Sequence, residues 1–337
     1  MSSTAKRSRK HIPWQDNEQL TPTQEFLARH YIEHYNQRHP KLTETGESEL
    51  INSFIPLKCP ICGSESFKKR GRTRNGIQRF QCICGKTFTP VTGTIFEGHK
   101  VSISEWMEFC LNLFRHLSIN ADSWNNKNAY TTSRYWLKKI FLILEDYQND
   151  IILKDMVWLD ETTYRYRIDD DRRYSASGTV TPNQLCIGVA LDNEHLICLF
   201  EGCGRTSASK TVKTFIDHIS PGATLIHDGE YSHNDLVKEL ELKSETHTIK
   251  ETKGLADKDN PLNPVNQAHN KLKKFLNSHS GFNRDDLQNY LNLFAFANNP
   301  PSDPLEKVEL LLQMAFLQKK TLKYRDLFKN SANASSV

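Results

Sequence analysis

Four cysteines in two closely spaced pairs are the residues whose types and spacing point most directly to chemistry. The pairs are Cys59 with Cys62, and Cys82 with Cys84. Four thiolates on two short turns provide the closed tetrahedral shell of a structural Zn²⁺ ion, and the glycines that follow the pairs, Gly63 and Gly85, tolerate the positive φ that such turns often need. We therefore expect a zinc ribbon over residues 51–95. Four unrelated buried thiols are the weaker alternative.

Two aspartates at the ends of apolar segments form a second candidate site. Asp160 follows Val157-Trp158-Leu159, and Asp228 follows Leu225-Ile226-His227. Carboxylates at the ends of neighbouring strands repel one another unless a cation is bound between them. Metal-assisted phosphoryl transfer uses this arrangement, in which two Mg²⁺ or Mn²⁺ ions stabilise the attacking and leaving oxygens. A single carboxylate could be an ordinary strand-end cap, so the expectation depends on the pair.

A third ligand is expected from the helix that begins near residue 264. No Asp or Glu occurs between Asn260 and Arg284, but Asn266, His269 and Lys273 share one helical face. An imidazole or an amide can bind a metal where a carboxylate would otherwise stand, and Lys273 can hold a phosphate. The ligand is either His269 or Asn266, and a plain polar helix face is the bland alternative.

Basic side chains are concentrated around the cysteine module. Residues 58–88 carry eight of them and one acid, Glu65. Such a density suits the neutralisation of nucleic-acid phosphates, although a solvated basic loop has the same composition. The expected DNA contacts in this region are Lys68, Lys69, Arg70, Arg72, Arg74 and Arg79.

Three helices are expected over residues 100–150, with a tight turn before the last. Apolar residues recur there at three- and four-residue spacing. A helix-turn-helix has this pattern, and so does any small helical bundle. If the third helix enters a DNA groove, its contacts are Thr132, Ser133, Arg134 and Lys138.

From residue 156 the periodicity changes to that of strands. The expected order is β-β-β-α-β-α-β-α, which is typical of an RNase H-like domain with a mixed five-stranded sheet, here over residues 154–300. The chain is therefore expected to be a multidomain α+β protein. Residues 1–50 are expected to form a basic tail and a helical segment, and residues 301–337 a helical tail. A polar connection is expected over residues 40–57.

Bulk composition excludes several classes of protein. The chain has 337 residues, 37% of them hydrophobic, a net charge of +4, and no run of 18 apolar residues. Its first residues are polar and basic, without the apolar segment of a secretion signal. We therefore expect a cytoplasmic protein whose cysteines are not paired in disulfides.

Residues 58–298 resemble the bacterial insertion-sequence transposases of the DDE superfamily that carry an N-terminal zinc ribbon and helix-turn-helix, of the ISXO-like branch. The resemblance rests on five short segments in the same order. They are Cys59-Pro60-Ile61-Cys62 with Cys82-Ile83-Cys84-Gly85, Trp158-Leu159-Asp160-Glu161-Thr162, Asp228-Gly229, Val265–Leu276 and Leu287–Phe294.

This resemblance implies a transposase that binds the terminal inverted repeats of its element, cleaves the 3′ ends and joins them to target DNA, acting as a dimer or larger assembly. It implies that Asp160 and Asp228 are metal ligands, and that His269 stands where most relatives have Glu. Some branches of the family have Asn or His there. The alternative is a catalytically inactive, domesticated DNA-binding regulator.

Overall fold

The computed structural model describes most of the chain and divides it into two compact units. The described residues are 44–98, 103–126, 128–165 and 184–327. One unit comprises Met1–Lys139 with Val308–Val337, and the other comprises Ile140–Lys307. The basic tail expected before residue 44 lies outside the described residues. Within the described ranges, none of the helices combines the length and hydropathy needed to span a bilayer.

A small three-stranded sheet follows the first cysteine pair. Its antiparallel strands are β1 (Phe67–Arg72), β2 (Gln78–Cys82) and β3 (Thr87–Phe88). One aromatic ring from each strand, Phe67, Phe80 and Phe88, packs into a core with centroid distances of 5.2 to 5.5 Å. Since this core is so small, the sheet has little other apolar burial to stabilise it.

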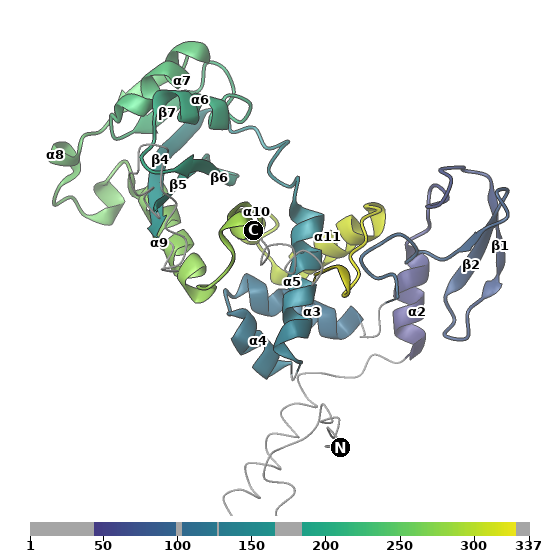
Figure 1. Cartoon of the computed structure of the whole chain (residues 1–337). Coiled ribbons are helices and arrows are strands. Elements are labelled where there is room, and N and C mark those ends of the chain that lie inside the picture. The colour runs from purple at the N-terminus through teal and green to yellow at the C-terminus, as the bar shows by residue number, and fades with distance from the viewer. Residues whose placement is uncertain (1–43, 99–102, 127, 166–183, 328–337) are drawn as a thin grey trace, which may run out of the picture. The chain divides into compact units, whose positions relative to one another are not determined.

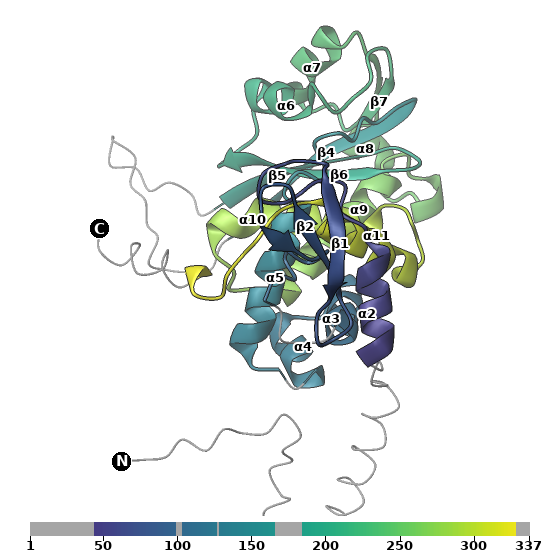
Figure 2. The same ribbon diagram turned by 90° about the vertical axis from the view of Figure 1, so that its right-hand side faces the viewer.

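A helix precedes the small sheet, and the polar connection expected at residues 40–57 is wrong over its central part. Helix α2 (Glu44–Ser53) docks on the β1–β2 turn through Asn52. The amide of Asn52 donates to the Gly76 carbonyl at 3.0 Å and accepts from the Gln78 N–H at 2.7 Å. Figure 2 shows helix α2 beside strand β1.

The three helices expected over residues 100–150 are confirmed as α3 (Ile103–Phe114), α4 (Ile119–Asn125) and α5 (Tyr130–Leu144). Trp106 and Phe109 are completely buried on α3. Ser118 caps α4 by accepting a hydrogen bond from the Ala121 N–H at 3.1 Å. The C-terminal helix α11 (Pro304–Leu317) ends in the same unit, where Phe316 stacks on Phe54 at 4.1 Å between centroids.

The second unit contains the expected mixed five-stranded sheet. Its strands are β4 (Met156–Arg165), β5 (Gln184–Leu191), β6 (Leu196–Cys203), β7 (Thr224–His227) and β8 (Lys243–Thr246), in the spatial order β6-β5-β4-β7-β8. The first three strands form an antiparallel meander, and β7 and β8 run parallel to β4. This order is consistent with the RNase H-like arrangement.

Helices cover both faces of the large sheet. Helices α6 (Ala208–Phe215) and α7 (Asn234–Glu239) lie on one face, and α9 (Asn263–Ser278) and α10 (Leu287–Asn298) lie on the other (Figures 1 and 2). Short helical turns occur at Tyr231–His233, Ile249–Thr252, Asp257–Asp259 and Arg284–Asp286. Because side chains alternate along a strand, neighbouring residues of β4 point toward different helices.

Candidate metal and nucleic-acid sites

Asp160 and Asp228 stand at corresponding positions of adjacent parallel strands. The last registered pair of β4 and β7 is Trp158 opposite Ile226, and each aspartate follows two residues later. Both aspartates are half-buried. The structure therefore brings the two aspartates together at the edge of the sheet where β7 ends. The prediction that Asp160 ends its own strand is wrong, because β4 continues to Arg165 through its pairing with β5.

The environment of Asp160 disfavours an isolated negative charge. Burial, followed by the charges of Asp228 and Glu161, raises the pKa of Asp160 to about 7. A bound cation would reverse this effect, because its charge would compensate both the lost hydration and the repulsion. The carboxylates thus fit a divalent metal ion.

His269 on α9 approaches the same edge. Its Nδ1 lies 3.7 Å from Oδ2 of Asp160, and its Nε2 is buried without a hydrogen-bond partner among the described residues. Burial lowers the pKa of His269 to about 4, so the imidazole is neutral at neutral pH and offers a lone pair. Asn266 and Lys273, on the same helix, are exposed.

Glu161 is a buried acid whose importance the sequence did not reveal. It follows Asp160 in β4, so its side chain lies on the α6–α7 face and is only 7% exposed. Both its oxygens lie 3.2 Å from Nε2 of His233, whose side chain is completely buried. The alternation of β4 could have indicated that Glu161 and Asp160 face opposite ways, but no pattern indicated the His233 partner.

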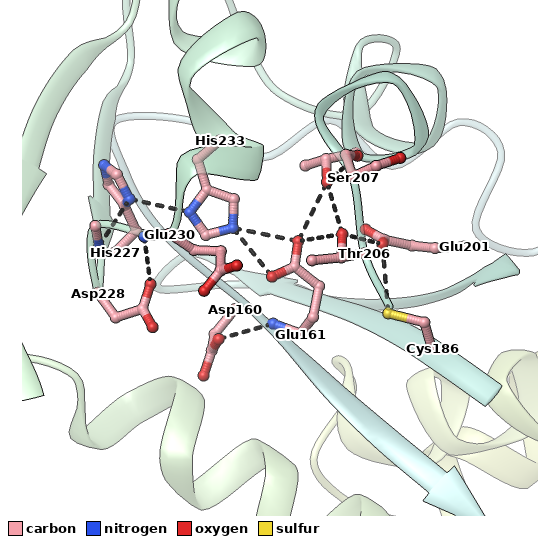
Figure 3. A network of polar contacts seen from close by, with 12 residues as sticks. Asp160, Glu161, Cys186, Glu201, Thr206, Ser207, His227, Asp228, Glu230 and His233 are labelled. Carbon is pink, nitrogen blue, oxygen red and sulfur yellow. Dashed lines mark hydrogen bonds and ion pairs between the residues drawn. The ribbon is translucent and has the colours of Figure 1, made fainter. Parts of the chain in front are cut away.

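The contacts of Glu161 belong to a polar network that crosses the sheet (Figure 3). On one side, Nδ1 of His233 lies 3.0 Å from Nδ1 of His227 on β7, whose Nε2 lies 2.9 Å from Oγ of Ser244 on β8. Although burial alone would lower it, the hydrogen bond and charge of Glu161 raise the pKa of His233. We name this part, Glu161-His233-His227-Ser244, the histidine chain.

On the other side, the network reaches β6. Thr211 donates to Glu161 at 3.3 Å, and Thr206 donates to Glu201 at 2.8 Å. Gly188, opposite Glu161 on β5, leaves the necessary space, since a Cβ there would lie 2.5 Å from the Phe215 ring and 2.9 Å from Glu201. Thr206 also donates to Glu161 at 3.5 Å, and the thiol of Cys186 on β5 donates to Glu201 at 3.6 Å, so the network extends over all five strands.

The four cysteines of the two pairs come together, as the sequence predicts. Their sulfur atoms lie within 4.8 Å of one another, with 3.5 Å between those of Cys62 and Cys82. A tetrahedral Zn²⁺ with Zn–S bonds of about 2.3 Å needs sulfur separations of roughly 3.8 Å, so this set fits the ion. Gly63 and Gly85 have φ of 76° and 80°, as expected. These glycines complete turns in which the Gly63 and Gly85 N–H groups donate to the Cys59 and Cys82 carbonyls.

The other cysteines lie outside this cluster. Cys110, Cys186 and Cys198 are buried, in keeping with the apolar segments in which they stand. Cys203 is exposed and contacts a guanidinium nitrogen of Arg284 at 2.5 Å.

The basic side chains on and beside the β1–β2 hairpin form an exposed surface. Strand β1 has no buried position, and only its first residue, Phe67, is half-buried. Lys68, Lys69, Arg70, Arg72, Arg74 and Arg79 are all exposed. They are therefore accessible to a polyanion along the β1–β2 hairpin, which we name the basic hairpin.

The candidate contacts on α5 differ in accessibility. Arg134 is exposed, and Thr132 and Lys138 are half-buried. Ser133 is completely buried. Its hydroxyl faces the packed side of the helix and is not available to DNA. The prediction that Ser133 contacts DNA is therefore wrong. Sequence periodicity did not identify this position as internal because serine is compatible with either face.

No family model and no curated protein matches the chain. Among solved structures, it is similar to the Mos1 strand transfer complex, with 14% identity, coverage of 61% of this chain and 73% of that chain, and a TM-score of 0.28. It is also similar to the Mos1 mariner paired end complex with Mn, with 14% identity, coverage of 61% of this chain and 74% of that chain, and a TM-score of 0.28. The chain is also similar to the simian T-cell lymphotropic virus intasome in complex with PP2A regulatory subunit B56 gamma. The identity is 12%, the match covers 58% of this chain and 69% of that chain, and the TM-score is 0.29.

Proposed function

We propose that this protein is a metal-dependent DNA transposase of the DDE type. The observation that carries the proposal is the meeting of Asp160, Asp228 and the neutral imidazole of His269 at one edge of a mixed sheet. Two hard oxygen ligands and a nitrogen ligand suit Mg²⁺ or Mn²⁺. A protein that also has an exposed basic hairpin and a four-cysteine cluster has the parts needed to hold DNA at such a centre.

The chain's own residues have distinct roles in this proposal. Asp160, Asp228 and His269 hold the metal ions, and His269 is favoured over Asn266 because only His269 is buried beside Asp160. Bound Mg²⁺ or Mn²⁺ supplies Lewis-acid stabilisation of the attacking and leaving oxygens. Lys273, exposed one turn after His269, holds a phosphate of the strand that reacts.

DNA is held by the first unit. The ribbon at residues 51–95 binds Zn²⁺ through its four cysteines and presents the basic hairpin to phosphates. Helices α3 to α5 act as a helix-turn-helix in which Thr132, Arg134 and Lys138 of α5 contact DNA. The bound sequence is the terminal inverted repeat of a bacterial insertion sequence, and two or more copies of the chain pair the ends in the cytoplasm.

Cleavage by aspartate variants tests this proposal. In Asp160→Asn or Asp228→Asn, an amide replaces a carboxylate of nearly equal volume, so we expect loss of 3′-end cleavage and strand joining with unchanged binding of the ends. Asp217→Asn, which changes an exposed acid on the α6 side, is the matched control and should remain active. Cleavage by either active-site variant at the wild-type rate would contradict the proposal.

The second candidate function is a DNA-binding regulator without catalysis. The observation that favours it is the histidine, His269, at a position that the transposase resemblance assigns to an acid in most relatives. Specific binding of repeat DNA by the wild-type protein, without cleavage in Mg²⁺ or Mn²⁺, would support this candidate instead.

A further inference from the structure

Hydrogen-bond directions in the histidine chain determine where its protons lie. The Gly229 N–H donates to Nδ1 of His227 at 3.3 Å, so this nitrogen is an acceptor and Nε2 carries the proton of His227. Nδ1 of His233, 3.0 Å from the same acceptor, must then donate. Because Nε2 of His233 faces both oxygens of Glu161 at 3.2 Å, it donates as well.

His233 therefore bridges His227 and Glu161 inside the protein through its two ring nitrogens. The side chains of His233 and Glu161 are 0% and 7% exposed. A buried pair of this kind tolerates little displacement, since separating the two side chains leaves their polar atoms without water or a partner.

The pair joins the two strands that carry the candidate metal ligands. Glu161 adjoins Asp160 in β4 and lies on the opposite face of the strand. Through His233 it reaches His227, which immediately precedes Asp228. Two hydrogen bonds thus connect Glu161, the neighbour of Asp160, to His227, the neighbour of Asp228.

The same cluster has too few free ligand atoms to be a metal site itself. Ligand atoms of His227, Asp228 and His233 lie within 4.8 Å of one another. However, all four ring nitrogens of the two histidines already contact Ser244, Gly229, one another or Glu161. A metal ion here would have to break these hydrogen bonds.

We propose that Glu161 and His233 are a positioning pair that sets the separation of Asp160 and Asp228, and with it the affinity for the divalent metal. The inference rests on the proposed function, because it assigns the metal to the two aspartates. Residues that orient metal ligands in this way change metal affinity by about 10- to 100-fold when they are replaced.

Mn²⁺ binding to the full chain tests the pair independently of activity. Binding is measured from the electron paramagnetic resonance signal of free Mn²⁺, alongside the Mg²⁺ concentration that gives half-maximal cleavage. We expect Glu161→Gln to weaken Mn²⁺ binding at least 10-fold and to raise the Mg²⁺ requirement similarly, with repeat-DNA binding unchanged. The double variant Glu161→Gln/His233→Gln, in which two amides can hydrogen-bond without charge, should recover most of the affinity.

Two further variants keep the test decisive. Glu161→Asp retains the charge but shortens the side chain, and should weaken Mn²⁺ binding in a folded protein even if Glu161→Gln does not fold. Glu201→Gln, at the other end of the network, is the matched control and should bind Mn²⁺ as the wild type does.

Three outcomes overturn the inference in different ways. Wild-type Mn²⁺ affinity in folded Glu161→Gln or Glu161→Asp rejects the positioning pair and leaves the proposed function intact. Mn²⁺ binding that survives Asp160→Asn and Asp228→Asn but disappears in His233→Gln makes the histidine cluster the metal site. Absence of Mn²⁺ binding and of metal-dependent cleavage in the wild type rejects the proposed function and the inference together.

Discussion

Nδ1 of His269 lies 3.7 Å from Oδ2 of Asp160, which is too long for a hydrogen bond, so the imidazole and the carboxylate stand side by side without a hydrogen bond between these two atoms. The two residues belong to α9 and β4, so the geometry depends on how this helix packs on the sheet.

This relationship predicts different effects for two alanine variants of the same helix. His269→Ala should lose cleavage in both Mg²⁺ and Mn²⁺, whereas Asn266→Ala, at an exposed position, should retain most of it. His269→Glu should be active and should use Mg²⁺ better than the wild type does, because a carboxylate is a harder ligand than an imidazole. Cleavage assays of the three variants in each metal measure this. The reverse order, with Asn266→Ala inactive, would make Asn266 the ligand.

The sequence was sufficient to predict much of this site because its parts are local. Apolar runs before Asp160 and Asp228 indicate two strands, and a parallel register then makes the two aspartates neighbours, although β4 continues past Asp160 to Arg165. His269 is recognisable from its place on a helix face. In each case the signal lies within about ten residues.

The histidine chain could not be predicted in this way. Glu161 and His233 are 72 residues apart, and their contact depends on how the turn at Tyr231–His233 packs over β4. The expected polar connection before the ribbon failed for a similar reason. Helix α2 has a weakly apolar sequence and is held by tertiary contacts of Asn52 with the β1–β2 turn.

The zinc content of the purified protein tests whether the four cysteines form a zinc ribbon. The purified protein should hold about one Zn²⁺ per chain, and Cys62→Ser should lose it and unfold the ribbon, because the small aromatic core cannot hold the strands without the metal. Repeat-DNA binding should fall at the same time. Cys203→Ser, an exposed cysteine outside the cluster, is the control and should keep the ion. Stoichiometric Zn²⁺ in a Cys59→Ser/Cys62→Ser variant would exclude this site.

The basic hairpin should contribute affinity without sequence preference. Replacing Lys68, Lys69 and Arg70 with Gln should weaken binding to repeat and random DNA alike. It should also reduce the slope of log K against log salt by about 0.9 for each phosphate contact that is lost. Lys58→Gln is a control in the same module, since Lys58 is already 3.4 Å from Glu65. An unchanged salt slope in the triple variant would mean that the hairpin does not contact phosphates.

Sequence preference should instead depend on α5. Arg134→Ala and Thr132→Ala should lower the ratio of specific to random DNA affinity, by about 1–3 kcal/mol for a side chain that contacts a base. Ser133→Ala should leave the ratio unchanged because its hydroxyl is buried. Competition binding assays measure the ratio. If only Ser133→Ala changed it, α5 would not be the helix that reads DNA.

The buried carboxyl of Asp122 should make the stability of the three-helix region depend on pH. Its Oδ1 accepts from the side-chain amides of Asn112 and Asn126 at 2.8 and 2.9 Å. Burial raises the pKa of Asp122 to about 6, although the hydrogen bond from Asn112 acts in the opposite direction. The folded carboxyl therefore keeps its proton at pH values where the unfolded one has lost it.

The sign of the effect follows from this difference in proton binding. Between pH 4 and pH 6 or so, the folded state binds more protons than the unfolded state, so the free energy of unfolding falls as the pH rises. By pH 7 the free energy of unfolding has fallen by roughly 2–3 kcal/mol relative to a protein whose residue at this position does not titrate.

In Asp122→Asn, Oδ1 retains both hydrogen bonds and no charge is buried, so the variant should match the wild type near pH 4 and exceed it in stability at pH 7. Amide hydrogen exchange in α3 to α5, compared between the two proteins at each pH, measures the difference. Asp217→Asn, an exposed aspartate of the other unit, should show none of it. A difference between wild type and Asp122→Asn that stayed constant from pH 4.5 to pH 7.5 would show that the carboxyl at Asp122 titrates normally in the folded protein.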